Sequence, residues 1–240
     1  MQKWTPPRTM TKDGIFYPHL STHLSAAAQR KEIREIFKFT RHPLLTEKMA
    51  ELLYRTLHSG FWMGPNKCNK KRGDIHTCMV CGQVENVLHT FCECYKITHF
   101  LTALLKWWEH RTSEQLSVSP RTMLLGLRDE DPTQFKDLTL PFTYLRGHAI
   151  STIKNERLRL QKGLEPRSVS QLVKDTLIEM QSSANMLFEA AKEWDKWSPP
   201  KEKEVHLRSV RSFKETWVDT GLAMLTRTKS LPVILRARGH

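Results

Sequence analysis

The sequence has no apolar run that approaches the roughly 18–20 residues needed to cross a membrane. The first residues, Met1 to Arg8, also lack the apolar core of a secretory signal. These two absences predict an intracellular, reducing location and no membrane partner. In such a compartment, clustered cysteines bind metals more often than they form disulfides.

Acidic residues are few relative to basic ones. The chain has 25 Asp and Glu against 38 Lys and Arg, which gives a formal net charge of +13. A surplus of this size favours polyanionic partners, nucleic acid first. The basic run Lys70-Lys71-Arg72 is shorter than a typical nuclear import signal and is only a hint of one, and with the net charge it makes the nucleus the expected location within the cell.

No internal repeat is present, and apolar residues recur at steps of three and four along most of the chain, which predicts a mainly α protein with little or no β-sheet. The expected helices cover residues 25–41, 43–57, 96–110, 132–161 (as one or two helices) and 168–197. Residues 120–128 should form a turn or a strand. In the tail, we expect a short docking helix through Phe213, Trp217, Leu222 and Leu225, followed by an extended end.

The chain divides into three parts by composition. Residues 1–40 are expected to be a loosely ordered N-terminal segment with one helix, residues 41–163 a zinc-binding domain, and residues 164–240 a long helix with a basic tail. The Asp129-Glu130-Asp131-Pro132 break and Gly163 punctuate the middle part.

Four of the five cysteines crowd between residues 78 and 94, and three of them give, with one histidine, the spacing Cys-x2-Cys-x7-His-x4-Cys, formed by Cys78, Cys81, His89 and Cys94. Two cysteines separated by two residues can bind one ion from a tight turn, and Gly82 permits the left-handed backbone that such a turn needs. Three thiolates and one imidazole satisfy a tetrahedral Zn²⁺ and leave no position for water. The predicted cofactor is one structural zinc ion in a small knuckle module.

Several alternatives stay open at this point. Cys92 could replace Cys94 as the fourth ligand, and Cys68, His76 and His99 lie nearby in the sequence. The group could also be ordinary buried cysteines. A zinc hydrolase or deaminase would need an open metal position and a carboxylate base, for which Glu85 is the only nearby candidate, and the deaminase order His-x-Glu is absent.

The region resembles the zinc-binding segment at the C-terminal end of reverse transcriptases from non-LTR, LINE-type retrotransposons. The matching positions are Cys78, Cys81, Gly82, Glu85, His89 and Cys94. In that family a leucine-rich helix and a basic loop precede the knuckle, like residues 44–57 and 67–72, and an aromatic-bearing helix follows it, like residues 100–108. Farther on, Arg157 matches a family arginine, whereas Lys154 stands where the family has a tryptophan.

The resemblance implies a polymerase tail without its catalytic parts. The family polymerase needs an Asp-Asp pair for two metal ions, and its endonuclease needs a Pro-Asp; this chain contains neither dipeptide. We therefore expect no enzymatic activity.

The predicted function is a non-catalytic module that binds RNA or single-stranded DNA. Its expected phosphate contacts are Lys67, Lys70, Lys71, Arg72, Lys154, Arg157 and Arg159, with Phe61 or Trp62 available to stack on a base. The alternatives are a protein-interaction scaffold built on the helix of residues 168–197, or an inactive retroelement remnant with only a structural zinc.

Overall fold

The computed structural model describes residues 26–40, 42, 44–57, 77–126, 139–197, 208, 210–225 and 232–234. Its elements, in chain order, are α1 (Ala26–Thr40), α2 (Glu47–Leu57), η4 (His89–Glu93), α3 (Tyr95–Thr112), η5 (Arg121–Leu125), α4 (Thr139–Gln161), α5 (Val169–Trp197), α7 (Val210–Phe213), η6 (Lys214–Val218), β1 (Ala223–Leu225) and β2 (Pro232–Ile234). The three η elements are π-helical turns. The prediction of a mainly α fold is confirmed.

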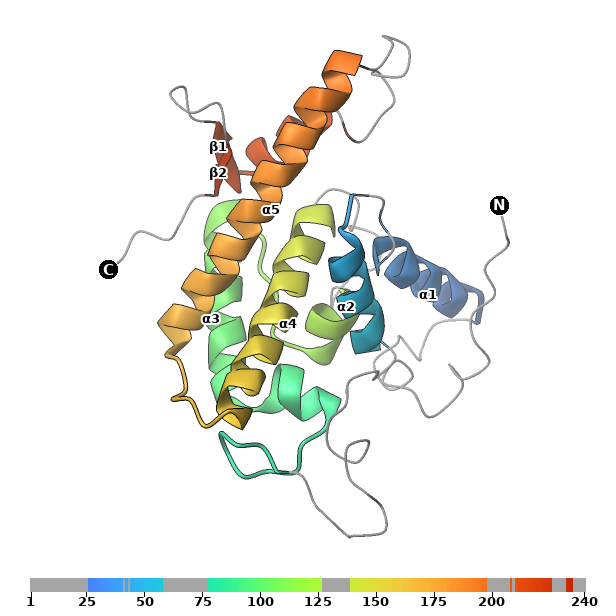
Figure 1. Ribbon diagram of the computed structural model, residues 1–240. Helices are drawn as coiled ribbons and strands as arrows, with labels where there is room; N and C mark the ends of the chain where they lie inside the picture. The colour runs from blue at the N-terminus through green and yellow to red at the C-terminus, as the bar shows by residue number, and fades with distance from the viewer. Residues whose placement is uncertain are drawn as a thin grey trace.

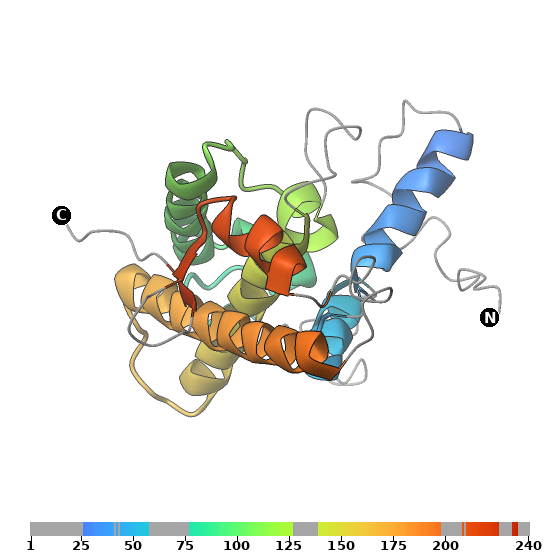
Figure 2. The ribbon, with the colours of Figure 1, turned by 90° about the horizontal axis from the view of Figure 1, so that it is seen from above.

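Three long helices form the centre of the molecule. Helix α5 lies across α3 and α4 and contacts both, while α2 packs on α4 and α1 lies at the outer side of α2 (Figures 1 and 2). The apolar stripe predicted for α3 is its buried face, and the side chains of Phe100, Leu104 and Trp108 have no exposed surface. Hydrophobic periodicity therefore identified this helix and its inward side correctly.

The C-terminal elements close one end of this core. Phe213 and Trp217 are buried, and their rings stack with centroids 6.0 Å apart. Phe213 also lies 5.1 Å from the ring of Phe188 on α5, and Trp217 lies 5.7 Å from Tyr144 on α4. The docking helix predicted in the tail is present as α7 with η6 for Phe213 and Trp217, but it ends at Val218: Leu222 follows it, and Leu225 lies in β1 instead of in a helix.

The strands β1 and β2 pair antiparallel and make the only sheet among the described residues, with Met224 opposite Val233. One hydrophobic core contains residues from Leu45 to Ala223, so elements on both sides of the expected boundary at residues 163 and 164 share it. No described helix is both long enough and apolar enough to cross a membrane.

Two local expectations are made more precise. Residues 120–128 were expected to form a turn or a strand, and in the described part of this stretch Arg121 to Leu125 form a π-helical turn that ends at Gly126, whose φ is 72°. Met123 and Leu124 on this turn are buried in the core, which explains the apolar run in the sequence.

Helix α2 begins at Glu47 rather than at residue 43, and the Thr46 hydroxyl accepts a hydrogen bond from the Met49 amide at 3.2 Å, as N-terminal caps do.

Candidate metal centre

Four side chains meet at one point between the segment of residues 77–88 and the start of α3. The ligand atoms of Cys78, Cys81, His89 and Cys94 all lie within 4.8 Å of one another. The Cys94 sulfur is 3.9 Å from the Cys78 sulfur and 4.0 Å from the Cys81 sulfur, and the Cys81 sulfur is 3.2 Å from Nε2 of His89. These four residues could hold one metal ion.

The distances suit a tetrahedral ion and exclude a disulfide. With metal–sulfur bonds of about 2.3 Å and metal–nitrogen bonds of about 2.0–2.1 Å, tetrahedral ligands lie about 3.8 Å apart for two sulfurs and about 3.6 Å apart for sulfur and nitrogen. The measured separations of 3.2 to 4.0 Å lie around these values. A disulfide would need sulfurs about 2.05 Å apart.

A tight turn aims the first two cysteines. The Cys78 amide donates to the Gln83 carbonyl at 2.7 Å, and the Gly82 amide donates to the Cys78 carbonyl at 2.8 Å. Gly82 has a φ of 74°, a left-handed conformation that is costly for residues with a Cβ. The expected role of this glycine is thus confirmed.

A π-helical turn aims the other two ligands, and sequence reasoning did not predict it. The Cys94 amide donates to the His89 carbonyl at 2.9 Å, a bond between residues five apart. On an α-helix, residues five apart would point about 140° away from each other, because each residue turns by about 100°. The wider turn with i→i+5 bonds brings them to the same side. Asn86 begins this turn, and its Oδ1 accepts from the His89 amide at 2.8 Å.

The choice between Cys92 and Cys94 has a geometric answer in the structure, which places Cys94 in the group and Cys92 outside it. Cys92 is buried, and this burial, followed by the charge of Glu93, raises the pKa of its thiol to about 12. His99 is exposed and lies edge-on to Tyr95 at 6.3 Å, away from the ligand group. Cys68 and His76 lie outside the described residues.

Burial disfavours the thiolate form of Cys94. Burial, followed by the neighbouring Cys78, raises the pKa of Cys94 to about 12, while the backbone amides of Lys96 and Ile97 act in the opposite direction. These amides belong to the start of α3, where unpaired N–H groups favour negative charge. A divalent cation would supply the rest of the compensation, because a metal ligand must be the deprotonated thiolate.

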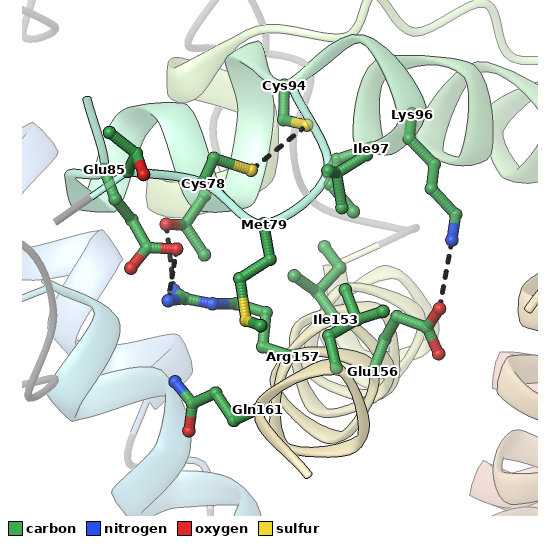
Figure 3. Close-up of a pocket in the computed structure, with 14 residues that line it drawn as sticks. Cys78, Met79, Glu85, Cys94, Lys96, Ile97, Ile153, Glu156, Arg157 and Gln161 are labelled. Carbon is green, nitrogen blue, oxygen red and sulfur yellow. Dashed lines mark hydrogen bonds and ion pairs between the residues drawn. The ribbon is translucent and has the colours of Figure 1, made fainter. Parts of the chain in front are cut away.

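One arginine of α4 connects both halves of the group. Arg157 forms an ion pair with Glu85 and donates from Nη1 to Oγ1 of Thr90 at 3.0 Å (Figure 3). Glu85 precedes the π-helical turn and Thr90 lies within it, so Arg157 holds the turn against α4. The side chains of Arg157 and Glu85 are only 16% and 9% exposed, which makes this a buried pair.

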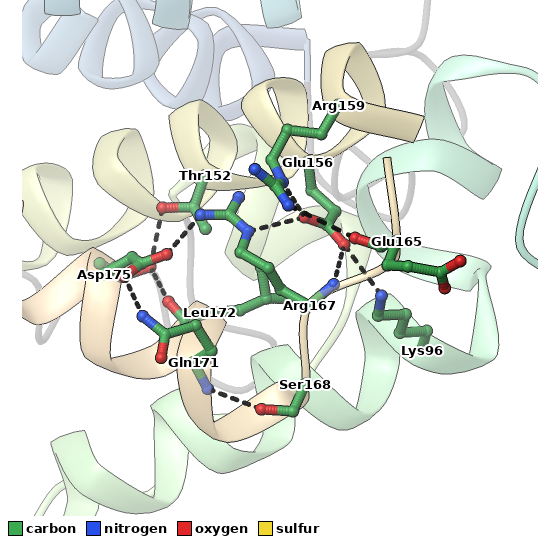
Figure 4. Close-up of polar contacts among 11 residues, drawn as sticks. Lys96, Thr152, Glu156, Arg159, Glu165, Arg167, Ser168, Gln171, Leu172 and Asp175 are labelled. Atoms are coloured by element: carbon green, nitrogen blue, oxygen red, sulfur yellow. Dashed lines mark hydrogen bonds and ion pairs between the residues drawn. The ribbon is translucent and has the colours of Figure 1, made fainter. Parts of the chain in front are cut away.

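Glu156, the residue before Arg157 on α4, holds the start of α3 in place through Lys96. Glu156 is 2% exposed and accepts from Lys96 Nζ at 3.0 Å, from Arg167 Nε at 2.7 Å and from the Arg167 amide at 2.8 Å (Figure 4). Nε of Arg159 lies 3.8 Å from Oε2 of Glu156. Since Lys96 follows Cys94 by two residues, this cluster helps to set the position of the fourth ligand.

The residues predicted to contact phosphate separate into different surroundings. Arg157 and Arg159 face the carboxylates just described, whereas Lys154 is exposed. Because each residue turns by about 100°, these cations leave α4 in different directions and do not form a single face. Lys67, Lys70, Lys71, Arg72, Phe61 and Trp62 lie outside the described residues.

A small pocket of about 110 Å³ lies between the ligand group and α4. Figure 3 shows Met79, Ile97 and Ile153 along its walls, with the Glu85–Arg157 and Lys96–Glu156 pairs at its sides. Among the described residues that line it, the two carboxylates, Glu85 and Glu156, are both paired with cations, so neither is free to act as a base.

No match was found among protein-family models, among curated proteins or among solved structures. The conclusions below therefore depend on the residues and geometry of this chain.

We predict that Arg157 is a structural residue. Arg157→Met leaves the Glu85 carboxylate buried without its partner and should lower the free energy of unfolding by about 3–5 kcal/mol. The measurement is urea unfolding at one fixed zinc concentration. Glu85→Gln combined with Arg157→Met should cost less than the two single changes added together.

Lys154→Met is the matched control on the same helix. Lys154 is exposed, so its removal should change the stability by no more than about 0.5 kcal/mol. Equal effects of the two methionine variants would contradict the structural role of Arg157.

The second prediction concerns pH. Burial raises the pKa of Glu156, but hydrogen bonds from Arg167 and Lys96 outweigh it and hold the pKa below its ordinary value of 4.5. A carboxyl whose pKa is lower in the folded state stabilises the fold above its unfolded-state pKa, and this stabilisation is lost as the pH falls through the folded-state pKa. The stability difference between wild type and Glu156→Gln should therefore be large near pH 7 and shrink below about pH 4.5.

Urea unfolding at several pH values measures this difference. Comparing the two proteins at each pH would also cancel any proton-driven loss of a bound metal ion, because both have the same ligand set. The control is Glu189→Gln, since the Glu189 side chain is 50% exposed and forms a surface pair with Lys192. A wild-type advantage over Glu156→Gln that does not change with pH would contradict the prediction.

Proposed function

We propose that this chain is a non-catalytic nucleic-acid-binding module whose Cys78, Cys81, His89 and Cys94 hold one structural zinc ion. The observation that carries the proposal is the closed group of three sulfurs and one imidazole nitrogen within 4.8 Å, in a chain of net charge +13.

Ligand chemistry favours zinc over other divalent ions. Thiolate and imidazole ligands in a tetrahedral set are typical of structural Zn²⁺, whereas Mg²⁺ and Ca²⁺ take oxygen ligands. Four protein ligands complete the coordination, so no position is left for a substrate or a reactive water. Glu85, the only sequence candidate for a base beside such an ion, is paired with Arg157 instead.

Charge and resemblance together favour nucleic acid as the partner. Lys and Arg side chains bind phosphates without strong sequence preference, and ion pairs remove one charge of each sign, so they leave the surplus of +13 unchanged. The resemblance to the tail of non-LTR reverse transcriptases is consistent with this partner. Two of the matching residues outside the ligand set, Glu85 and Arg157, also form the ion pair that joins the knuckle to α4. The basic run Lys70-Lys71-Arg72 supports a nuclear location as part of the same proposal.

A protein-interaction role is the second candidate. Along α5, the side chains of Ile178, Met186 and Trp197 are 39%, 56% and 75% exposed, respectively. The opposite side of α5 packs on the protein's own core through residues such as Leu172, Met180 and Ala184. This internal packing accounts for most of the apolar stripe that first suggested a scaffold.

The third prediction tests the metal. Purified protein should contain one zinc per chain by elemental analysis, and Cys78→Ser, Cys81→Ser, His89→Ala and Cys94→Ser should each abolish stoichiometric binding. Structural zinc in small modules contributes about 10–16 kcal/mol, so chelation should unfold the segment around the site.

Cys92→Ser is the matched control, and it should retain the metal because Cys92 lies outside the ligand group. Well-folded wild-type protein without metal would refute the zinc proposal. Loss of zinc in Cys92→Ser with retention in Cys94→Ser would refute the ligand set.

The fourth prediction tests nucleic-acid binding. Fluorescence anisotropy with labelled single-stranded 20-mers of RNA and DNA should show binding at low salt. If about four phosphates are contacted, the slope of log affinity against log salt should be about −2.8, which corresponds to about a 50-fold loss between about 50 and about 200 mM salt. No binding at the lowest salt, or an affinity that does not respond to salt, would refute this function.

A further inference from the structure

A second and larger hollow lies on the other side of α4. It has a volume of about 580 Å³ and is lined by residues of α2, α4 and α5. On α4 its lining residues include His148, Ser151 and Asn155, whereas residues 153, 156 and 157 face the metal centre. At about 100° per residue, these two sets leave the helix on roughly opposite sides. We refer to this hollow as the α2–α4–α5 groove.

The rim of the groove carries exposed cations from two helices, namely Lys48 and Arg55 from α2 and Lys154 from α4. Two carboxylates, Glu51 and Glu179, also line it, which leaves a net charge of +1 from these five side chains. Arg55 pairs with Glu51, but both side chains are more than half exposed. An exposed pair contributes at most about 1 kcal/mol, so Arg55 can exchange this carboxylate for a phosphate.

The floor of the groove is polar and uncharged. Nε2 of His148 and Oγ of Ser183 lie 2.9 Å apart, and both residues are buried. Burial lowers the pKa of His148 to about 4, so its imidazole is neutral at neutral pH. Ser151 and Asn155 add a hydroxyl and an amide to the α4 wall. A ligand in the groove would therefore meet hydrogen-bonding groups at the bottom and positive charge at the edge.

Apolar side chains lie beside these polar groups. Met49, Leu52 and Met186 line the groove, and Met186 is 56% exposed. Methionine side chains adapt to flat ring systems and make favourable sulfur–aromatic contacts. The volume is within the range of about 300–1,000 Å³ that is usual for pockets holding drug-sized ligands, a size class that includes a nucleotide.

From this arrangement we infer that the α2–α4–α5 groove binds an unpaired stretch of RNA or DNA, with phosphates at Lys48, Arg55 and Lys154 and a base directed toward His148 and Ser183. Single strands present free base edges and faces, whereas a duplex keeps its bases stacked and paired. This inference rests on the proposed nucleic-acid function, and it locates the contact on the side of α4 away from the metal. An acidic protein segment is the competing occupant.

The first test compares two charge-reversed double variants of the full chain. Lys48→Glu with Lys154→Glu alters the groove, and Lys106→Glu with Lys174→Glu makes the same change in charge at exposed positions outside the groove lining. The groove variant should bind a labelled single-stranded 20-mer at least about tenfold more weakly than the control variant. Its salt slope should be smaller in magnitude by about 1.4, which is about 0.7 for each lost phosphate contact.

The results separate this inference from the function on which it depends. Equal losses in the two variants, with binding by the wild type, would overturn the groove and leave the nucleic-acid function standing. No binding by the wild type would overturn both. All four lysines are exposed, and circular dichroism with zinc content establishes that each variant is folded before binding is compared.

The second test identifies the occupant. An oligonucleotide containing 4-thiouridine should photo-crosslink to peptides within residues 46–55, 148–155 or 179–186. Unlabelled oligouridylate should also displace the probe at a charge concentration at least about tenfold below that of poly-glutamate, since a groove that receives bases distinguishes the two polyanions. Crosslinks confined to other peptides, or equal displacement by poly-glutamate, would overturn the inference.

Discussion

The convergence of three sulfurs and one imidazole at a buried point is the constraint on which this part of the molecule depends. Burial opposes the charge on the Cys94 thiol, yet a metal ligand must be a thiolate. A divalent cation would resolve this conflict in the folded protein, and the amides at the start of α3 would assist it. The same ion would connect the tight turn that carries Cys78 to the helix that follows Cys94.

Helix α4 contributes the surroundings of this site through two successive residues. Arg157 is paired with Glu85 and Thr90, and Glu156 is paired with Lys96 and Arg167. Both carboxylates are buried, so each depends on its cationic partners for solvation. The contacts of Arg157 and Glu156 are few, but they fix how the knuckle and the start of α3 are oriented against α4. The position of the ligands thus depends on residues more than sixty positions later in the chain.

The sequence was informative wherever local rules decide the outcome. The x2 spacing, Gly82 and the stripe of α3 follow from turn geometry and helical periodicity, and the structure contains all three as expected. The π-helical turn between His89 and Cys94 was not predicted, because its i→i+5 bonds leave no periodic signal in five residues; Asn86 three positions earlier was the one available cue. The partners of Arg157 and Glu156 could not be predicted either, since they come from distant segments that only the packing of α3 and α4 brings together.

Because distant packing decides which charged residues pair, the charge of the chain must be interpreted residue by residue. A basic stretch such as residues 154–162 suggests one continuous cationic face, but a helix distributes successive residues around its axis. Here one side of α4 turns its cations toward buried carboxylates, and the other side places Lys154 at the rim of a groove. Internal ion pairs remove positive and negative charges together, so the surplus of +13 is preserved but confined to the remaining cations. Net charge thus predicts the class of partner, whereas the location of contact is decided by which cations the fold leaves without a buried carboxylate.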